Sequence, residues 1–265
     1  MNKSLEERLA SFLHTAEERK EKAQRFMSTQ PQAIKCERHP HIVRSISLEW
    51  TCWATKDHQG ELTAGYEPCA LCAEERTEAL VRERLHSQGV PENLLRATLD
   101  NWRPDAENVG HAEFIHTFSI DKRGFLILLG DIGTGKTHLA VGVMRNFKNA
   151  FFVKQNTLLR MLRQTYRDGA AIDPVTQCQR AGLLVLDEMG LSSGGRDELP
   201  LLHEILDYRH GERKPTILTG NLDWQALTEI IGQRLSDRLK ESAYRVLVFK
   251  GESKRREARD EYFNK

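Results

Sequence analysis

The sequence lacks the features of a membrane or exported protein. No apolar run approaches the roughly 20 residues that a transmembrane helix needs, and the N-terminal segment MNKSLEERLASF has no apolar signal-peptide core. We therefore expect a cytoplasmic protein without a membrane partner. Cysteine is also scarce, with five in 265 residues, and in a reducing compartment such cysteines are metal ligands or free thiols rather than disulfides.

An excess of charge of either sign is absent too. The 39 Lys and Arg residues nearly balance the 38 Asp and Glu residues, for a net charge of +1. Any surface that binds nucleic acid must therefore be local. With 39% hydrophobic and 29% charged residues, the composition is that of a folded globular chain, and the length suits one or two domains.

Four of the potential metal ligands occur as two closely spaced pairs, Cys36-x-x-His39 and Cys69-x-x-Cys72. A two-residue spacing lets a tight turn aim two ligands at one ion, and four such ligands complete a tetrahedral zinc site. We expect the zinc to be structural, because the pattern suggests neither an open coordination position nor a general base.

Other residues leave alternatives open around this site. His41 could replace His39, Cys52 is a spare ligand, and Cys178 stands apart as an ordinary thiol. The pairs belong to an expected N-terminal domain over residues 1–89, a zinc-ribbon-like module that docks a partner. Within it the pattern indicates an amphipathic helix at 4–30, a strand at 42–50, and a turn running into a helix at 69–88.

From about residue 90 onward, short apolar runs alternate with amphipathic segments. This order predicts an α/β domain over 90–265 with a mainly parallel sheet. The expected strands lie at 124–129, 151–154, 183–186 and 216–219, and the expected helices at 136–147, 156–167, 197–209 and 223–240.

Residues 130–137 match the phosphate-binding pattern G-x-x-x-x-G-K-[ST], with a buried strand before and a helix after. Backbone N–H groups of such a loop wrap phosphates at a helix N-terminus. Lys136 would reach the β- and γ-phosphates of ATP, and Thr137 would place its hydroxyl on Mg²⁺. The expected nucleotide-binding residues are Gly130, Asp131, Ile132, Gly133, Thr134, Gly135, Lys136, Thr137 and His138.

A second motif, which is acidic, lies about 50 residues after the glycine-rich loop. Four apolar residues, 183–186, deliver Asp187 and Glu188 to the end of an expected strand, which is a Walker B arrangement. Asp187 would hold Mg²⁺ through water, and Glu188 would polarise the water that attacks ATP, giving ADP and phosphate.

Polar residues after the next strand and on the last helix are further candidates. Asn221 is placed to orient water beside the γ-phosphate, a sensor-1 role, with Thr219 as the alternative. Arg234 and Arg238 are four apart on one helix face. A guanidinium on the γ-phosphate stabilises charge in the transition state, although spacing alone does not separate this role from a solvated basic face.

Taken together, these motifs resemble the DnaC/IstB group of AAA+ ATPases. The resemblance covers about residues 90–258 and is carried by GTGKTHLA, LVLDEMG, PTILTGN, GQRLSDR and GESKR, with VPEN and LDNW in the lead-in. It implies an AAA+ P-loop fold that self-associates and holds ATP at subunit interfaces. It also implies that Arg238 is the arginine finger and Arg255 the sensor-2 arginine, with Lys254 and Arg256 as flanking alternatives.

The resemblance also implies contact with single-stranded DNA over about 158–180, where several residues offer charge or a stacking ring. These residues are Arg160, Arg163, Tyr166, Arg167 and Arg180.

The function implied is an ATP-dependent loader of a DnaB-type hexameric replicative helicase onto single-stranded DNA. The N-terminal Cys/His module resembles that of phage and mobile-element loaders. The alternative is an IstB-like transposition helper that binds duplex DNA and stimulates a transposase.

Overall fold

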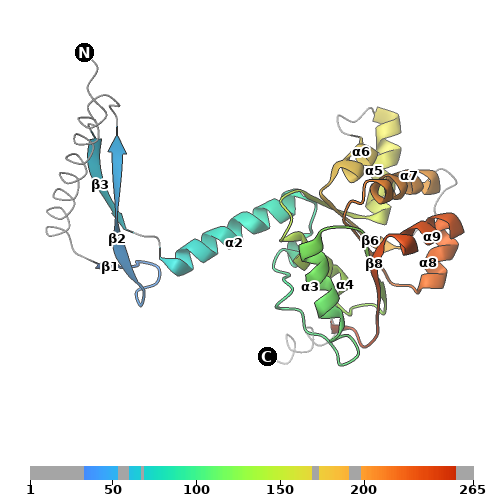
Figure 1. The fold of residues 1–265 in the computed structure, drawn as a ribbon, viewed down its shortest axis with the longest axis horizontal. Coiled ribbons are helices and arrows are strands. Elements are labelled where there is room, and N and C mark those ends of the chain that lie inside the picture. The colour runs from blue at the N-terminus through green and yellow to red at the C-terminus, as the bar shows by residue number, and fades with distance from the viewer. Residues whose placement is uncertain (1–32, 53–59, 67–68, 169–172, 191–197, 255–265) are drawn as a thin grey trace, which may run out of the picture. The chain divides into compact units, whose positions relative to one another are not determined.

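The protein is described here by a computed structural model, which places residues 33–52, 60–66, 69–168, 173–190 and 198–254. The chain divides into two compact units, Met1–Leu80 and Val81–Lys265 (Figure 1). The helix expected at 4–30 lies outside the described residues. Within the described ranges, no helix is long and apolar enough to cross a membrane.

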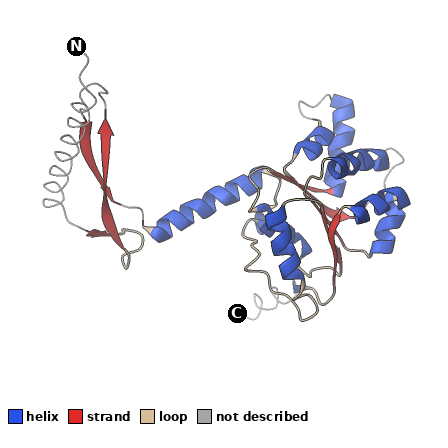
Figure 2. Cartoon of the chain, viewed as in Figure 1, coloured by secondary structure: helices blue, strands red, loops and turns tan. Residues whose placement is uncertain are grey.

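The first unit contains an antiparallel sheet of three strands, in the order β1-β2-β3. The expected strand at 42–50 is present as β2 (Val43–Cys52) and pairs with β1 (Ala33–Lys35) and with β3 (Gly60–Tyr66). The sequence did not predict β3, because glycines at both ends of its GELTAGY core give it little intrinsic preference for a strand. Helix α2 (Ala70–Ser87) follows the sheet in the chain (Figure 2).

The second unit is built on five parallel strands in the order β5-β6-β7-β4-β8. This arrangement confirms the α/β fold with a mainly parallel sheet. An edge strand, β8, was not among the expected strands, although its sequence AYRVLVF favours a strand. The strands are β4 (Phe125–Gly130), β5 (Ala150–Lys154), β6 (Leu183–Met189), β7 (Thr216–Gly220) and β8 (Ala243–Phe249).

Helices cover both faces of this sheet (Figure 1). The helices expected at 223–240 are present as two, separated at Gly232, whose φ of +80° ends one helix and starts the next. The helical segments are η1 (Glu92–Leu94), α3 (His111–Asp121), α4 (Lys136–Met144), α5 (Gln155–Asp168), α6 (Pro174–Arg180), α7 (Glu198–Gly211), α8 (Trp224–Ile231) and α9 (Gln233–Glu241).

The central strand β4 is buried on both faces, as expected for a covered parallel sheet. Leu126 and Leu128 pack into one apolar cluster with α3 and α4, whereas Phe125, Ile127 and Leu129 pack into a second cluster with α5 to α9. Because all five strands run the same way, their carboxyl ends share one edge, where ligands of such folds bind.

Candidate nucleotide and metal sites

The glycine-rich loop connects β4 to α4 at that edge. Gly133 and Gly135 have φ angles of +82° and +96°, which glycine adopts without strain. Neither position has room for a side chain. A Cβ on Gly133 would clash with the Ser253 hydroxyl, and one on Gly135 would lie 2.6 Å from Trp102 Nε1. Helix α4 begins at Lys136 with no side chain capping its first N–H groups, so these donors suit an anion.

The two motifs that are 50 residues apart in the chain meet at Asp187. Thr137 Oγ1 donates to Asp187 Oδ1 at 2.8 Å, and Thr219 Oγ1 donates to the same oxygen at 2.5 Å. The Asp187 side chain is 2% exposed. The structure therefore brings together the two residues that the sequence assigned to Mg²⁺, and hydroxyl and carboxylate oxygens are the donors that Mg²⁺ prefers.

Two further residues predicted to contact phosphate, Lys136 and His138, make different contacts in the structure. Lys136 is buried, and its Nζ donates to the carbonyl oxygens of Gly130 at 2.9 Å and Asp131 at 2.5 Å. The ring of His138 faces the segment ahead of the sheet, with Nε2 2.7 Å from Asn101 Oδ1. Burial lowers the pKa of His138, which favours a neutral ring at pH 7.

The Glu188 carboxylate pairs with Lys154, a residue that no sequence motif indicated. Lys154 Nζ at the end of β5 lies 2.9 Å from Glu188 Oε1. Glu188 has a φ of +57°, and the β6–β7 register shifts between Leu186 and Met189, an irregularity that re-aims a side chain at a strand end. Lys154 pairs in register with Asp187, so correct strand pairing alone would have found it.

Of the two sensor-1 candidates, the structure places Thr219 against the Walker B residues. Its Oγ1 also accepts from the backbone N–H of Glu188 at 3.3 Å. Asn221 is exposed one residue beyond β7. The sequence analysis placed Asn221 first and Thr219 as the alternative. In the structure, the Thr219 side chain is the one that donates to Asp187.

The C-terminal segment closes over the glycine-rich loop. Lys254 N donates to Gly133 O at 3.1 Å, and Gly251 N donates to Asp131 Oδ2 at 3.1 Å. These contacts bring the GESKR motif to the loop. Arg255, the sensor-2 candidate, lies outside the described residues.

The arginine-finger candidate makes an ion pair within its own subunit. Arg238 Nη1 contacts Asp207 Oδ2 on α7, and this hydrogen bond raises the pKa of Arg238. Arg234 is exposed one turn earlier on α9. Asp207 carried no signal in the sequence, because the contact depends on how α7 packs against α9.

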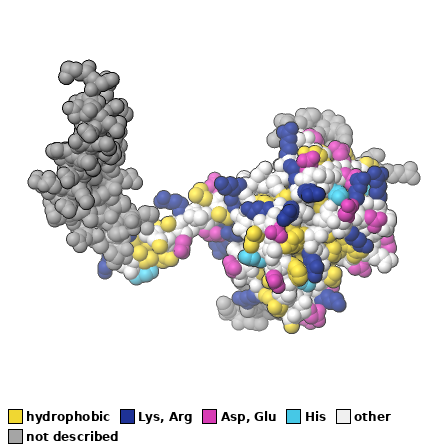
Figure 3. Space-filling model, viewed as in Figure 1, with side chains coloured by type: hydrophobic (Ala, Val, Ile, Leu, Met, Phe, Trp, Pro, Cys, Tyr) yellow, Lys and Arg dark blue, Asp and Glu magenta, His cyan; other side chains and the backbone are white. Residues whose placement is uncertain are grey.

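The candidate DNA-contacting arginines Arg160, Arg163 and Arg180 are exposed on α5 and α6. The side chains of Tyr166 and Arg167 lie outside the described set. Figure 3 shows basic and acidic side chains interspersed over the face in view rather than one broad basic field, in keeping with the net charge of +1.

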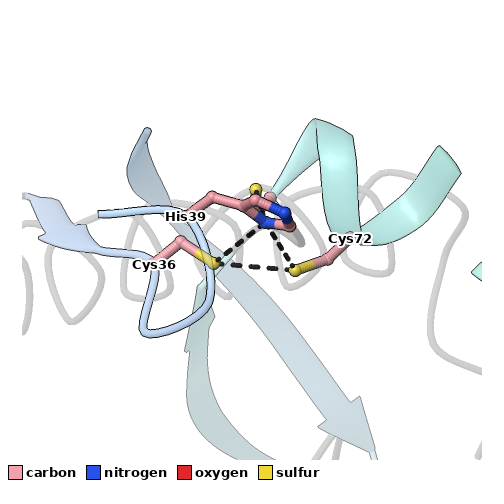
Figure 4. A group of neighbouring side chains, drawn as sticks. Cys36, His39 and Cys72 are labelled. Atoms are coloured by element: carbon pink, nitrogen blue, oxygen red, sulfur yellow. Dashed lines mark hydrogen bonds between the residues drawn. The ribbon is translucent and has the colours of Figure 1, made fainter. Parts of the chain in front are cut away.

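In the first unit, Cys36, His39, Cys69 and Cys72 form one cluster whose potential ligand atoms all lie within 4.8 Å of one another. Cys36 and His39 come from the loop between β1 and β2, and Cys72 from the first turn of α2 (Figure 4). Cys36 Sγ lies 3.6 Å from Cys72 Sγ, and His39 Nδ1 lies 3.9, 3.6 and 3.3 Å from the sulfurs of Cys36, Cys69 and Cys72.

These separations fit a zinc ion. Tetrahedral coordination with ordinary Zn–S and Zn–N bonds spaces two sulfurs about 3.8 Å apart, and a sulfur and a nitrogen about 3.6 Å apart. His39 rather than His41 belongs to the cluster; the His41 ring is exposed, with its centroid 6.2 Å from that of His39. The side chain of Cys52 is outside the described set.

The pKa values of two thiols in the cluster are shifted in opposite directions. Burial would raise the pKa of Cys36, but hydrogen bonds from the His39 backbone and from the Cys72 and His39 side chains lower it to about 6. Burial and the neighbouring thiols raise the pKa of Cys72 to about 11. One thiolate forms readily and the next is repelled, and a bound cation would remove that repulsion. By contrast, burial raises the pKa of Cys178 to about 12, as expected for an inert thiol.

Comparison with known proteins defines the class. Residues 105–261 match the family model described as IstB-like ATP binding protein. This is more than half of the chain, and the protein belongs to that family.

Its relatives include proteins named as replicative helicase loader DnaC. The one from Buchnera aphidicola is 24% identical over 235 residues, which cover 84% of this chain and 93% of the relative. The one from Escherichia coli is 23% identical over 154 residues, 54% of this chain and 62% of that protein, so less than two thirds of it is spanned. A crystal structure of the DnaC helicase loader matches with a TM-score of 0.55 and 23% identity, over 60% of this chain and 100% of that one. This likeness shows the AAA+ P-loop fold.

Proposed function

We propose that this protein uses ATP to load a DnaB-type hexameric helicase onto single-stranded DNA. The observation that carries the proposal is the extent of one match. Similarity to a protein named as a replicative helicase loader runs over 235 residues, well beyond the 105–261 span of the ATP-binding family model. Because this match covers 84% of the chain, it extends ahead of the ATPase core into part of the expected partner-docking domain at 1–89.

In this proposal the chain's own residues divide the work of hydrolysis. The loop 130–137 binds the phosphates, and Lys136 turns from its loop carbonyls to the β- and γ-oxygens. Thr137 and Asp187 hold Mg²⁺, which would neutralise phosphate charge. Glu188 polarises the attacking water once it leaves Lys154.

The remaining candidates act later or in another subunit. Thr219 or Asn221 orients the water, Arg238 reaches a neighbour's γ-phosphate after leaving Asp207, and Arg255 acts on its own subunit's nucleotide. Hydrolysis by a lone subunit is therefore slow, because the finger comes from a second copy. The exposed arginines of α5 and α6 contact single-stranded DNA, and hydrolysis resets the complex and releases the loader.

The test is assembly with a replicative helicase hexamer, followed by native mass spectrometry with ATP or ADP, with or without single-stranded DNA. We expect a complex of defined stoichiometry that depends on nucleotide. Glu188→Gln should bind ATP, lose hydrolysis by about 10²-fold or more and trap this complex. Glu212→Gln, an exposed acid on the same domain, is the matched control and should behave as the parent protein.

A transposition helper is the competing function, favoured by the description of the matching family. It predicts ATP-dependent assembly on duplex DNA and no helicase complex. That pair of results would overturn the loader proposal.

A further inference from the structure

We infer that Glu75 is a positioning residue for the cysteine–histidine cluster: it orients the His39 ring so that Nδ1, not Nε2, is the metal-binding atom. This inference rests on the proposed zinc site and adds to it a residue outside the four ligands.

The geometry gives the two ring nitrogens of His39 different neighbours. Nδ1 lies within 3.9 Å of all three sulfurs, whereas Nε2 lies 3.4 Å from Glu75 Oε1. A neutral imidazole has one N–H and one lone pair. A proton on Nε2 would lie on the side of the Glu75 carboxylate and would leave the lone pair on Nδ1, which faces the sulfurs, as a metal ligand needs.

The position of Glu75 follows from the same spacings that build the cluster. Glu75 is three residues after Cys72 on α2, so both side chains lie on one helix face. The second carboxylate oxygen, Oε2, lies 2.7 Å from Nη2 of Arg38, which sits between Cys36 and His39. The Glu75 carboxylate thus joins the helix to the loop that carries the other ligand pair.

The expected sizes of the effects on stability and on metal affinity distinguish this role from that of an ordinary surface ion pair. The side chains of Arg38 and Glu75 are 69% and 46% exposed, and pairs this exposed contribute little to stability. Partners of a metal-bound histidine, by comparison, change metal affinity by about 10–100-fold when removed. Zinc affinity is therefore the sensitive readout, and overall stability is not.

The experiment measures zinc affinity of the full chain by competition with a chromogenic chelator. We expect Glu75→Ala to weaken zinc binding by about 10–100-fold and Glu75→Gln, which keeps an acceptor oxygen, to weaken it less. Glu74→Ala, an exposed neighbour on the same helix, is the matched control and should leave affinity unchanged. Far-ultraviolet circular dichroism checks that α2 is intact in each variant.

A double-mutant cycle with His39→Cys tests the mechanism, because a fourth thiolate has no ring to orient. Glu75→Ala should then cause no further loss of zinc affinity. Equal losses in both backgrounds, or none in either, would overturn the inference while leaving the zinc site in place. A parent protein that binds no zinc would instead remove the site itself. Nitrogen-15 NMR of the zinc-loaded parent should show a protonated Nε2 on His39; a metal-bound Nε2 would contradict the assignment.

Discussion

The two compact units differ in what buries their apolar surface. In Val81–Lys265, two apolar clusters fill both sides of the parallel sheet, and each fully buried aliphatic or aromatic side chain contributes about 1.5–3 kcal/mol. Among the side chains that the structure describes in the small unit, at 35–42, 44 and 69–80, the buried apolar ones are Cys36 and Cys69, both candidate metal ligands. The large unit thus folds around a hydrocarbon core, whereas the feature that the described residues of the small unit share is a cluster of possible metal ligands.

The largest expected effect therefore comes from removing the metal. Structural zinc supplies on the order of 10 kcal/mol in zinc-finger peptides, so chelation or Cys72→Ser should unfold the first unit and spare the second. Hydrogen exchange should show lost protection in β1 and β2, with protection of β4 and nucleotide binding retained. Adding zinc back to the chelated parent protein is the control. Unchanged protection in β2 after chelation would contradict the prediction that the first unit depends on the metal.

The next largest effect tests the core of the second unit through its buried arginine. Arg209 is fully buried, and it donates to the carbonyl oxygens of Cys178, Ala181 and Pro215 and to the hydroxyl of Thr216. Burial lowers its pKa to about 10, so it stays charged at pH 7.

Arg209→Met should lower the free energy of unfolding by about 3 kcal/mol or more, because several buried acceptors lose their donor. Urea denaturation monitored by fluorescence measures the change. The exposed Arg96→Met should cost less than about 0.5 kcal/mol. Similar losses for the two variants would mean that Arg209 is not a structural centre of this unit.

A smaller effect concerns catalysis rather than stability. The pair between Lys154 and Glu188 is partly exposed, at 41% and 34%, and such pairs are worth up to about 1 kcal/mol. If Lys154 restrains Glu188, Lys154→Met should raise basal ATP hydrolysis by up to about fivefold with KM unchanged. Lys154→Arg should stay near the parent rate. Loss of hydrolysis in Lys154→Met would show that Lys154 instead supports the active position of Glu188.

The smallest effect is a helix cap whose contribution depends on pH. Asp173 accepts from the N–H groups of Val175 and Thr176 at the start of α6. Burial alone would raise its pKa, but these bonds and the Thr176 hydroxyl lower it below the ordinary value of 3.8. Its charged form therefore stabilises the fold above pH 3.8, and the contribution is lost as pH falls through the lower, folded-state value.

Asp173→Ala should cost about 1 kcal/mol at pH 7. Asp173→Asn, which keeps a capping oxygen, should cost less at pH 7 and remove this acid-dependent contribution. Chemical denaturation from pH 7 to pH 3 measures both. A constant difference between parent and Asp173→Asn over that range would contradict the assignment.

The sequence pattern was sufficient to predict a site wherever all of its characteristic residues lie within one short segment. The glycine-rich loop, the apolar strand before Asp187 and the two ligand pairs were predicted because chemistry demands those residue types at those spacings. Strand β3 was missed because its propensity is weak and its stability comes from pairing with β2. Strand β8 was missed although its sequence AYRVLVF favours a strand.

The sequence by itself determined which groups are available: a phosphate loop, a pair of acids and a four-ligand cluster, each encoded within a few residues. Tertiary structure decided which of them meet. Only the parallel pairing of β5, β6 and β7 sets Lys154 against Glu188 and Thr219 against Asp187, and only the approach of α2 to the β1–β2 loop brings Glu75 to His39. Such contacts depend on strand order and packing between distant segments, which side-chain periodicity does not encode.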